Sequence, residues 1–289
     1  ALLVGNGSYD PLNSLGQGDQ DIIPVKMGWS ASIRTSIDQW YATVDGSDYL
    51  ADIHIGRIPA VSSASLSNAI SKIIQYEVSV SNSIWSESVL LVADNKDVAQ
   101  NLDFKAFTEA NTVMHLTNGG FSVLGIGTAY LDNINATQVR TAINSDLSNG
   151  VQLISYMGHG SEDKWAAEDV WKIQDATTRV NTIYPIFSVF TCENGAFHDS
   201  TNSLAEAIVL SKGSGSACFA PSAFSIDVNS EKIADGYFAA IATNRVPKLG
   251  DAMQEGFLRL WGYNPAAREL LFYTLMGDPA QAVWGGAKP

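Results

Sequence analysis

The sequence has few cysteines, few basic residues and no long apolar segment. Only Cys192 and Cys218 occur among its 289 residues, so a disulfide framework is excluded, although a lone thiol can still act as a nucleophile. No apolar run approaches the ~18 residues of a membrane-spanning helix, and the N-terminus lacks the basic segment of a signal peptide. We therefore expect a soluble, already trimmed domain without a membrane span.

The scarcity of basic residues makes the chain strongly acidic. Seventeen Lys and Arg stand against 30 Asp and Glu, which gives a formal net charge of -13. Such a charge repels the phosphate backbone, so we expect no nucleic-acid partner. The simplest interpretation of the excess of acidic residues is that it keeps the protein soluble. Two other interpretations are attraction of basic substrates and binding of structural calcium by the Asp-rich loops at 10–21 and 45–52.

The motifs of several common enzyme classes are also missing. The four histidines form no H-x-x-x-H pair and the two cysteines form no C-x-x-C pair, so no zinc site is predicted. A serine hydrolase would need a G-x-S-x-G elbow, which does not occur. The glycines at the N-terminus lack the third member of a dinucleotide-binding loop, because Asp10 stands in its place. No cofactor is therefore predicted for catalysis.

The sequence does contain an alternation of strands and helices. Short apolar runs predict strands at 49–58, 89–92, 121–126, 151–157, 183–191 and 216–220. Helical spacing predicts helices at 65–78, 104–116, 137–147 and 204–210. Strands separated by helices indicate an α/β protein with a mostly parallel sheet and helices on both faces. We predict a smaller N-terminal α/β subdomain over residues 1–86 and a larger one over 87–289.

Two of these strands end on residues that can perform covalent catalysis. The strand at 151–157 leads into Gly158-His159-Gly160, and the strand at 183–191 leads into Cys192. Functional residues of such sheets gather beyond the carboxyl ends of the strands, so both side chains would meet at one edge. His159 could then accept the thiol proton of Cys192 and later protonate the leaving amine. The backbone N–H groups of Gly160 and Cys192 could stabilise the oxyanion.

Each of these residues also has a structural interpretation. Taken alone, Cys192 could pack as a small apolar side chain, and His159 could complete a turn. Cys218 lies among small residues and is predicted to belong to the core. His198, which follows Cys192 in a polar loop, is an alternative base.

Two longer segments resemble the catalytic segments of gingipain-like cysteine peptidases. They are ISYMGHGSEDKW at 154–165 and FSVFTCENGAF at 187–197, and similar segments follow the same order along nearly the whole chain, at 49–59, 204–207 and 276–279. The resemblance implies a caspase-like α/β fold. It also implies a secreted or cell-surface bacterial endopeptidase that uses His159 as base and Cys192 as nucleophile and forms an acyl-enzyme.

The resemblance assigns further site residues. The upstream acid that orients the histidine corresponds best to Asp94. The acid that shapes the primary specificity pocket corresponds to Asp103, which could instead be a carboxylate that stabilises a helix N-terminus. Trp165 and Ser222 are further candidates for substrate contact. A basic residue before the cut is the expected preference, although the pocket segment at 219–225 lacks the tryptophan of arginine-selective members.

The chain also departs from the family pattern. Glu193 stands beside the nucleophile where gingipains have a small apolar residue, and its carboxylate could raise the pKa of Cys192. An immunoglobulin-like domain, a propeptide and a secretion tail are expected to lie outside this chain, and the partners are protein or peptide substrates. Two other functions fit the same residues: a sortase-like transpeptidase, in which an amine releases the acyl-enzyme, and a non-catalytic adhesion or scaffold domain.

Overall fold

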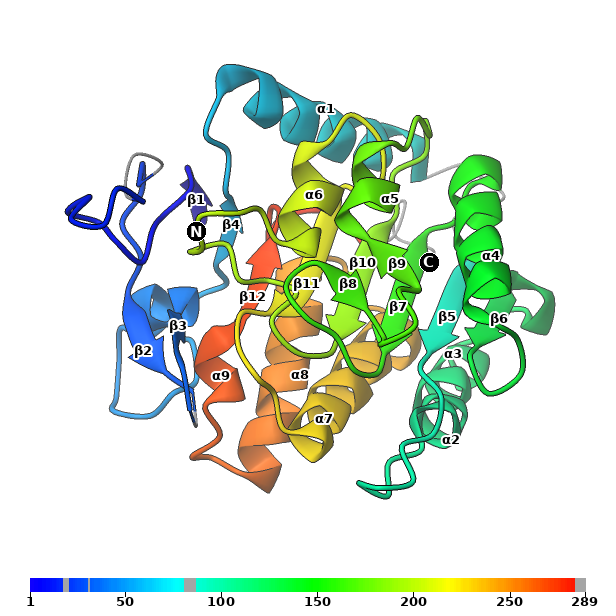
Figure 1. Ribbon diagram of the computed structural model, residues 1–289. Coiled ribbons are helices and arrows are strands. Elements are labelled where there is room, and N and C mark those ends of the chain that lie inside the picture. The colour runs from blue at the N-terminus through cyan, green and yellow to red at the C-terminus, as the bar shows by residue number, and fades with distance from the viewer. Residues whose placement is uncertain (18–20, 31, 81–86, 284–289) are drawn as a thin grey trace.

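The computed structural model describes residues 1–17, 21–30, 32–80 and 87–283, and an eight-stranded sheet forms its centre (Figure 1). In sheet order the strands are β1 (Leu2–Val4), β4 (Gly56–Ile58), β12 (Tyr273–Met276), β11 (Ala217–Pro221), β10 (Ile186–Phe190), β7 (Leu153–Met157), β5 (Val89–Ala93) and β6 (Ile126–Tyr130). Neighbouring strands are parallel except for β11 and β12. Two hairpins are added, β2 (Met27–Trp29) with β3 (Arg34–Ser36) and β8 (Lys164–Trp165) with β9 (Trp171–Lys172).

Helices cover both faces of the sheet and enclose two apolar cores. One core includes residues of α1 (Ser63–Val80), α4 (Ala136–Asn149), α5 (Ile173–Thr177) and α6 (Leu204–Leu210). The other includes residues of α2 (Phe104–Phe107), α3 (Met114–Asn118), α7 (Asp227–Phe238), α8 (Leu249–Tyr263) and α9 (Glu269–Phe272). Successive residues of a strand point to opposite faces, so Leu90 joins the first core and Leu91 the second.

Shorter helical turns complete the chain: 3₁₀ turns η1 (Asp38–Ala42) and η3 (Val123–Gly125), and π turns η2 (Thr108–Val113) and η4 (Ala239–Thr243). The turn η2 links α2 to α3, so the helix predicted at 104–116 is present as one run of helical residues. The other three predicted helices correspond to α1, α4 and α6. The predicted α/β class, with a mostly parallel sheet between helices, is confirmed.

Two strand predictions need correction. The segment 121–126 is not a strand, because Ser122 caps the 3₁₀ turn η3 and β6 begins only at Ile126. Of the segment 49–58, only the last three residues form β4. The carboxylate of Asp52 accepts the N–H groups of Val44 and Asp45, which folds the preceding residues into a loop.

The N-terminal part of the chain shares the central sheet. Its strands β1 and β4 extend the sheet beyond β12, and α1 packs against α6. The predicted boundary between residues 86 and 87 falls at 81–86, outside the described residues. The division into two subdomains therefore stays a prediction.

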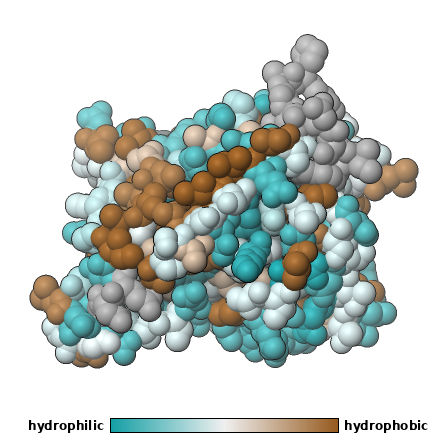
Figure 2. Space-filling view, turned by 90° about the horizontal axis from the view of Figure 1, so that it is seen from above, coloured by the Kyte–Doolittle hydropathy of each residue, from teal (hydrophilic) through white to brown (hydrophobic). Residues whose placement is uncertain are grey.

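The outer face of α1 is unusually apolar. Seen from above, a band of apolar surface crosses the molecule (Figure 2), and Ile70, Ile74 and Val78 recur every four residues along the exposed side of this helix. Among the helices in the described residues, none combines the length and the hydropathy that crossing a bilayer requires.

Candidate active site

The ends of β7 and β10 bring His159 and Cys192 to neighbouring points of the sheet edge. The two strands are adjacent and parallel, with Met157 in register with Phe190. His159 and Cys192 each lie two residues beyond these positions, and the N–H of Gly158 donates to the carbonyl of Phe190 at 3.3 Å. Because adjacent strands are ~4.8 Å apart, the loops that carry the two residues leave the sheet side by side.

Two carboxylates fix His159. Its backbone N–H donates to Oδ2 of Asp94 at 3.0 Å, and its ring Nε2 lies 3.2 Å from Oδ2 of Asp97. The Phe104 ring contacts the imidazole edge-on at 5.2 Å between centroids, and the Tyr156 hydroxyl donates to the His159 carbonyl at 2.6 Å. Within the described residues, Nδ1 is the ring nitrogen without a hydrogen bond. The predicted orienting acid, Asp94, thus holds the backbone, while Asp97 holds the ring.

The glycines on either side of His159 permit close approaches. A Cβ on Gly158 would overlap the Cβ of Asp94, and a Cβ on Gly160 would overlap the Thr191 hydroxyl. Throughout the described part of the chain, the backbone N–H groups of Gly160 and Cys192 form no hydrogen bond. Both are therefore available to a ligand at the sheet edge.

Cys192 lies in an acidic environment. The thiol is partly buried, and its Sγ lies 3.8 Å from the carbonyl oxygen of Ser225, which follows β11. Burial is the main cause that raises the pKa of Cys192, and the charges of Asp227, Glu193 and Glu269 raise it further. Burial and these charges thus favour the thiol over the thiolate, in the direction that the position of Glu193 suggested.

Asp227 couples electrostatically to both reactive residues. It is the first residue of α7 and is half-buried. Burial raises its pKa and the charge of His159 lowers it, while Asp227 itself raises the pKa of Cys192. Ser225, whose carbonyl oxygen lies 3.8 Å from Sγ of Cys192, precedes Asp227 by two residues, so Asp227 stands at the same edge of the sheet as the thiol.

Sequence analysis missed Asp97 and Asp227, because a single aspartate in a loop forms no motif. A positional signal was nevertheless present. Each residue follows a predicted strand, at 89–92 and 216–220, and so stands beyond a carboxyl end at the reactive edge of the sheet.

Asp103 serves as the N-cap of α2. Its Oδ1 accepts the N–H of Ala106 at 2.9 Å, and its Oδ2 pairs with Lys96 at 3.1 Å. This matches the alternative that the sequence left open, a carboxylate at a helix N-terminus. A place in the specificity pocket stays a prediction.

Trp165 and Ser222 are buried, so their contact with a substrate stays a prediction that their exposure does not support. Trp165 stacks on Tyr156 at 4.6 Å between ring centroids, and its Nε1–H donates to Oδ1 of Asn194 at 2.6 Å. The Ser222 hydroxyl donates to the carbonyl of Ser36 at 2.8 Å. Both support the loops around the site from within. Cys218 is completely buried in β11, as predicted.

The loops considered for calcium do not fit a metal ion well. The carboxylate of Asp10 accepts the N–H groups of Ser14, Leu15 and Gln17, and that of Asp52 is likewise used by its own loop. In the described ranges, no group of three or more His, Cys, Asp or Glu side chains is placed to hold a metal ion. Structural calcium stays a prediction without support from these donor sets.

Comparison with known proteins gives a consistent result. The model of peptidase family C25 matches residues 1–284. Gingipain R2 of Porphyromonas gingivalis is 28% identical over 202 residues, which are 68% of this chain and 26% of that protein. Lys-gingipain of the same species is 30% identical over 151 residues, which are 52% of this chain and 8% of that protein. The chain thus spans about a quarter or less of these curated relatives.

The fold agrees as well. The crystal structure of the Arg-specific cysteine proteinase gingipain R matches with a TM-score of 0.82 at 21% identity, over 98% of this chain and 64% of that one. The predicted caspase-like architecture is therefore confirmed. Because the family model covers nearly the whole chain, this protein belongs to peptidase family C25 and is gingipain-like.

Proposed function

We propose that this chain is the catalytic domain of a cysteine endopeptidase in which Cys192 attacks the peptide carbonyl and His159 transfers protons. The observation that carries this proposal is the register of β7 and β10, which sets the two residues side by side in a chain of family C25. The backbone N–H groups of Gly160 and Cys192, which are available at the same edge of the sheet, also support this proposal.

The first half of the reaction forms a thioester. Asp97 accepts Nε2–H of His159, which leaves Nδ1 as the basic nitrogen. Nδ1 removes the thiol proton as Sγ attacks the carbonyl carbon, and the N–H groups of Gly160 and Cys192 donate to the developing oxyanion. The C–N bond then breaks, and the His159 imidazolium protonates the leaving amine.

The second half of the reaction releases the acid. Water attacks the thioester carbonyl while His159 accepts one of its protons, and the departing thiolate takes that proton back. An amine in place of water would give transpeptidation. Mass spectrometry of products formed with an added amine distinguishes the two: hydrolysis products alone are expected.

The proposed substrates carry a basic residue before the cut. Asp227 supports this preference, because it follows Ser225, which contacts Cys192, by two residues, and its carboxylate forms no ion pair in the described part of the chain. Phe224 and Ile226 next to it are exposed and would contact the aliphatic stem of a Lys or Arg side chain.

We also propose a secreted or cell-surface location in a bacterium, which the sequence resemblance implies. The partners are protein or peptide substrates, with propeptide or secretion-tail segments outside this chain. Fractionation of the producing cells tests the location, since an exclusively cytoplasmic protein would contradict it.

Fluorogenic peptides test the peptidase activity. Arg or Lys before the reporter is expected to support cleavage, and Cys192→Ala should reduce it by at least roughly a thousand-fold. Iodoacetamide adds an internal control: the folded protein should be alkylated at Cys192 and not at the buried Cys218, whose pKa is also raised by burial. Equal cleavage after neutral residues would contradict the preference for basic residues, and equal alkylation of the two cysteines would contradict Cys192 as the accessible nucleophile.

The role of Asp97 is tested by Asp97→Asn. We expect kcat to fall by about one to two orders of magnitude and the pH profile to shift, because the carboxylate that fixes the imidazole is lost. Asp103→Asn is the matched variant on the same segment, since its carboxylate is occupied by the helix cap. A larger effect on the preference for basic substrates in Asp103→Asn would instead place Asp103 in the specificity pocket.

A further inference from the structure

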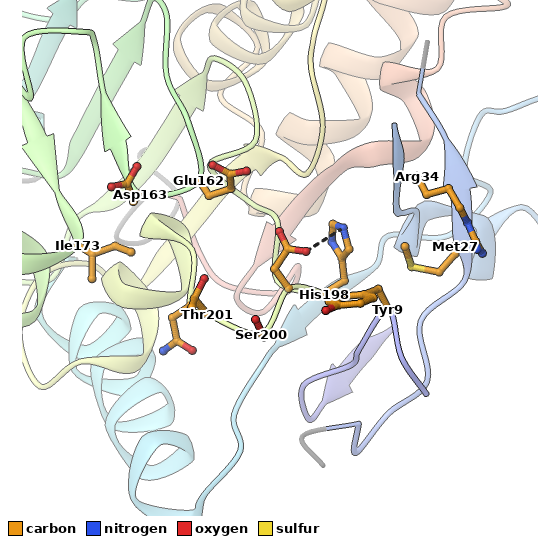
Figure 3. A pocket seen from close by; sticks show the side chains of 11 residues that line it. Tyr9, Met27, Arg34, Glu162, Asp163, Ile173, His198, Ser200 and Thr201 are labelled. Atoms are coloured by element: carbon orange, nitrogen blue, oxygen red, sulfur yellow. Dashed lines mark ion pairs between the residues drawn. The ribbon is translucent and has the colours of Figure 1, made fainter. Parts of the chain in front are cut away.

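Residues of the loops that follow His159 and Cys192 help to line a cavity of about 800 Å³, and Figure 3 shows the side chains around it. Four parts of the chain line it: the N-terminal segment with Tyr9 and Arg34, the loop after β7 with Glu162, the start of α5 with Ile173, and the loop after Cys192 with His198. The last loop leads to α6, whereas Asp227 begins α7 on the other face of the sheet. The cavity and the proposed basic-residue pocket therefore lie on opposite faces.

The wall of the cavity is acidic and incompletely paired. Glu162, Asp163 and Asp199 line it against a single cation, Arg34. Among the described residues, the side-chain carboxylates of Glu162 and Asp199 accept no hydrogen bond, and neither forms an ion pair with a Lys or Arg. Arg34 forms no ion pair in the same part of the chain. The carboxylate of Asp163 accepts the Ser161 hydroxyl at 2.7 Å. The cavity thus presents carboxylates without cationic partners.

His198 supplies a second, independent feature of this wall. Its side chain is buried, with the residue only 5% exposed, and Nδ1 lies 3.1 Å from the Ser36 hydroxyl. Nε2 is 3.8 Å from Asp199, too far for a hydrogen bond, so it has no such partner within the described ranges. Burial lowers the pKa of His198 to about 4, so the ring is neutral and does not neutralise Asp199. In the tautomer whose Nδ1–H donates to the Ser36 hydroxyl, Nε2 is an acceptor that lacks a donor.

Glu193 links this cavity to the nucleophile. It follows Cys192 directly and has a left-handed backbone with φ of 56°. Burial raises its pKa to about 7, and the charges of Glu162 and Asp199 contribute to that rise. The carboxylates of the cavity wall therefore lie within short electrostatic range of the residue next to Cys192.

We infer that this cavity is a substrate subsite for a second basic side chain, Lys or Arg, on the residue adjacent to the one before the cut. The inference rests on the proposed peptidase function. Successive side chains of an extended peptide point to opposite sides. With the first basic residue beside Asp227, either of its neighbours points to the face of α5 and α6, where ammonium or guanidinium donors would meet Glu162, Asp199 and His198.

Paired peptides test the subsite. All peptides have Arg before the cut. In the first series, the residue that precedes this Arg is either Lys or its uncharged analogue norleucine. In the second series, the residue that follows this Arg is either Lys or norleucine. The wild-type protein is expected to show a kcat/KM about five- to ten-fold higher for Lys in one series. Glu162→Gln should move this ratio towards one, and adding Asp199→Asn should remove the preference.

Glu168→Gln is the matched control, because Glu168 is an exposed carboxylate of the same loop outside the cavity. It should keep the wild-type ratio, and thermal melts check that all variants are folded. Equal cleavage of Lys and norleucine peptides in both series, or an unchanged ratio in Glu162→Gln, would overturn the subsite and leave the peptidase function standing.

Complete absence of cleavage would count against the peptidase function, and a binding measurement then decides on the subsite. Calorimetry with Cys192→Ala protein should show tighter binding of a Lys peptide than of its norleucine partner, with the difference reduced by Glu162→Gln. Equal affinities would reject the subsite.

Discussion

Glu206 is a buried residue whose proton affects stability. It lies near the start of α6, where its Oε2 accepts the N–H and hydroxyl of Ser203 at 2.7 and 2.9 Å. Burial raises its pKa from 4.5 to about 8. The folded state therefore holds the proton more tightly than the unfolded state, and this group makes the protein less stable as the pH rises between those two values.

Glu206→Gln isolates this effect, because glutamine keeps an oxygen that accepts from Ser203 but does not titrate. The free energy of unfolding of the wild-type protein should fall by up to ~1.4 kcal/mol per pH unit more steeply than that of the variant in this range. Urea unfolding of both proteins at several pH values between about 5 and 8 measures the difference. Parallel curves would show that Glu206 does not titrate in this range.

The sequence predicted the places of some site residues and not of others. Cys192 and His159 stand at the ends of predominantly apolar segments, which mark the reactive edge directly. Asp97 reaches the imidazole because its backbone forms a bridge with Leu102, which folds the loop back on itself. No local sequence pattern predicts this loop conformation. The burial of Trp165 could not be predicted from its local sequence, because its indole N–H donates to Asn194, a partner distant in sequence.

At the scale of elements, α1 offers a test of which face it buries. Ile73 is 8% exposed and belongs to the core, whereas its neighbour Ile74 is 58% exposed. Ile73→Ala is expected to lower the free energy of unfolding by about 2 to 4 kcal/mol, because it leaves a cavity. Ile74→Ala should change it by about 0.5 kcal/mol or less. Urea unfolding compares them, and similar losses would contradict the orientation of α1.

The strands that were predicted well are those buried on both faces. All residues of β5, β7, β10 and β11 are buried, so each appears in the sequence as a predominantly apolar segment. The edge strand β6 includes Gly127 and exposed Thr128, which interrupt such a run. The apolar residues that suggested a strand nearby include Leu124, which is 98% exposed. Apolar character alone therefore placed this strand five residues too early.

At the scale of the whole molecule, one buried ion pair joins distant parts of the chain. Arg57 in β4 donates to Asp38 from Nε at 2.6 Å and from Nη2 at 2.9 Å. Its Nη1 donates to the carbonyls of Gly5 and Ile23 at 2.8 and 3.2 Å. The guanidinium also lies 4.7 Å from the ring centre of Phe197, in the loop that follows Cys192. The N-terminal segment and the cysteine loop thus depend on the same side chain.

Removal of this arginine is expected to be costly for the whole fold. Arg57→Met leaves Asp38 buried without a counter-charge, so the free energy of unfolding should fall by about 3 to 5 kcal/mol. Adding Asp38→Asn should recover part of this loss, because the uncompensated charge is then gone. Urea unfolding measures both proteins, with peptide cleavage followed well below the unfolding transition. An equal loss in the single and double variants would assign the cost to the carbonyl and Phe197 contacts, which both variants lack, and not to the charge of Asp38.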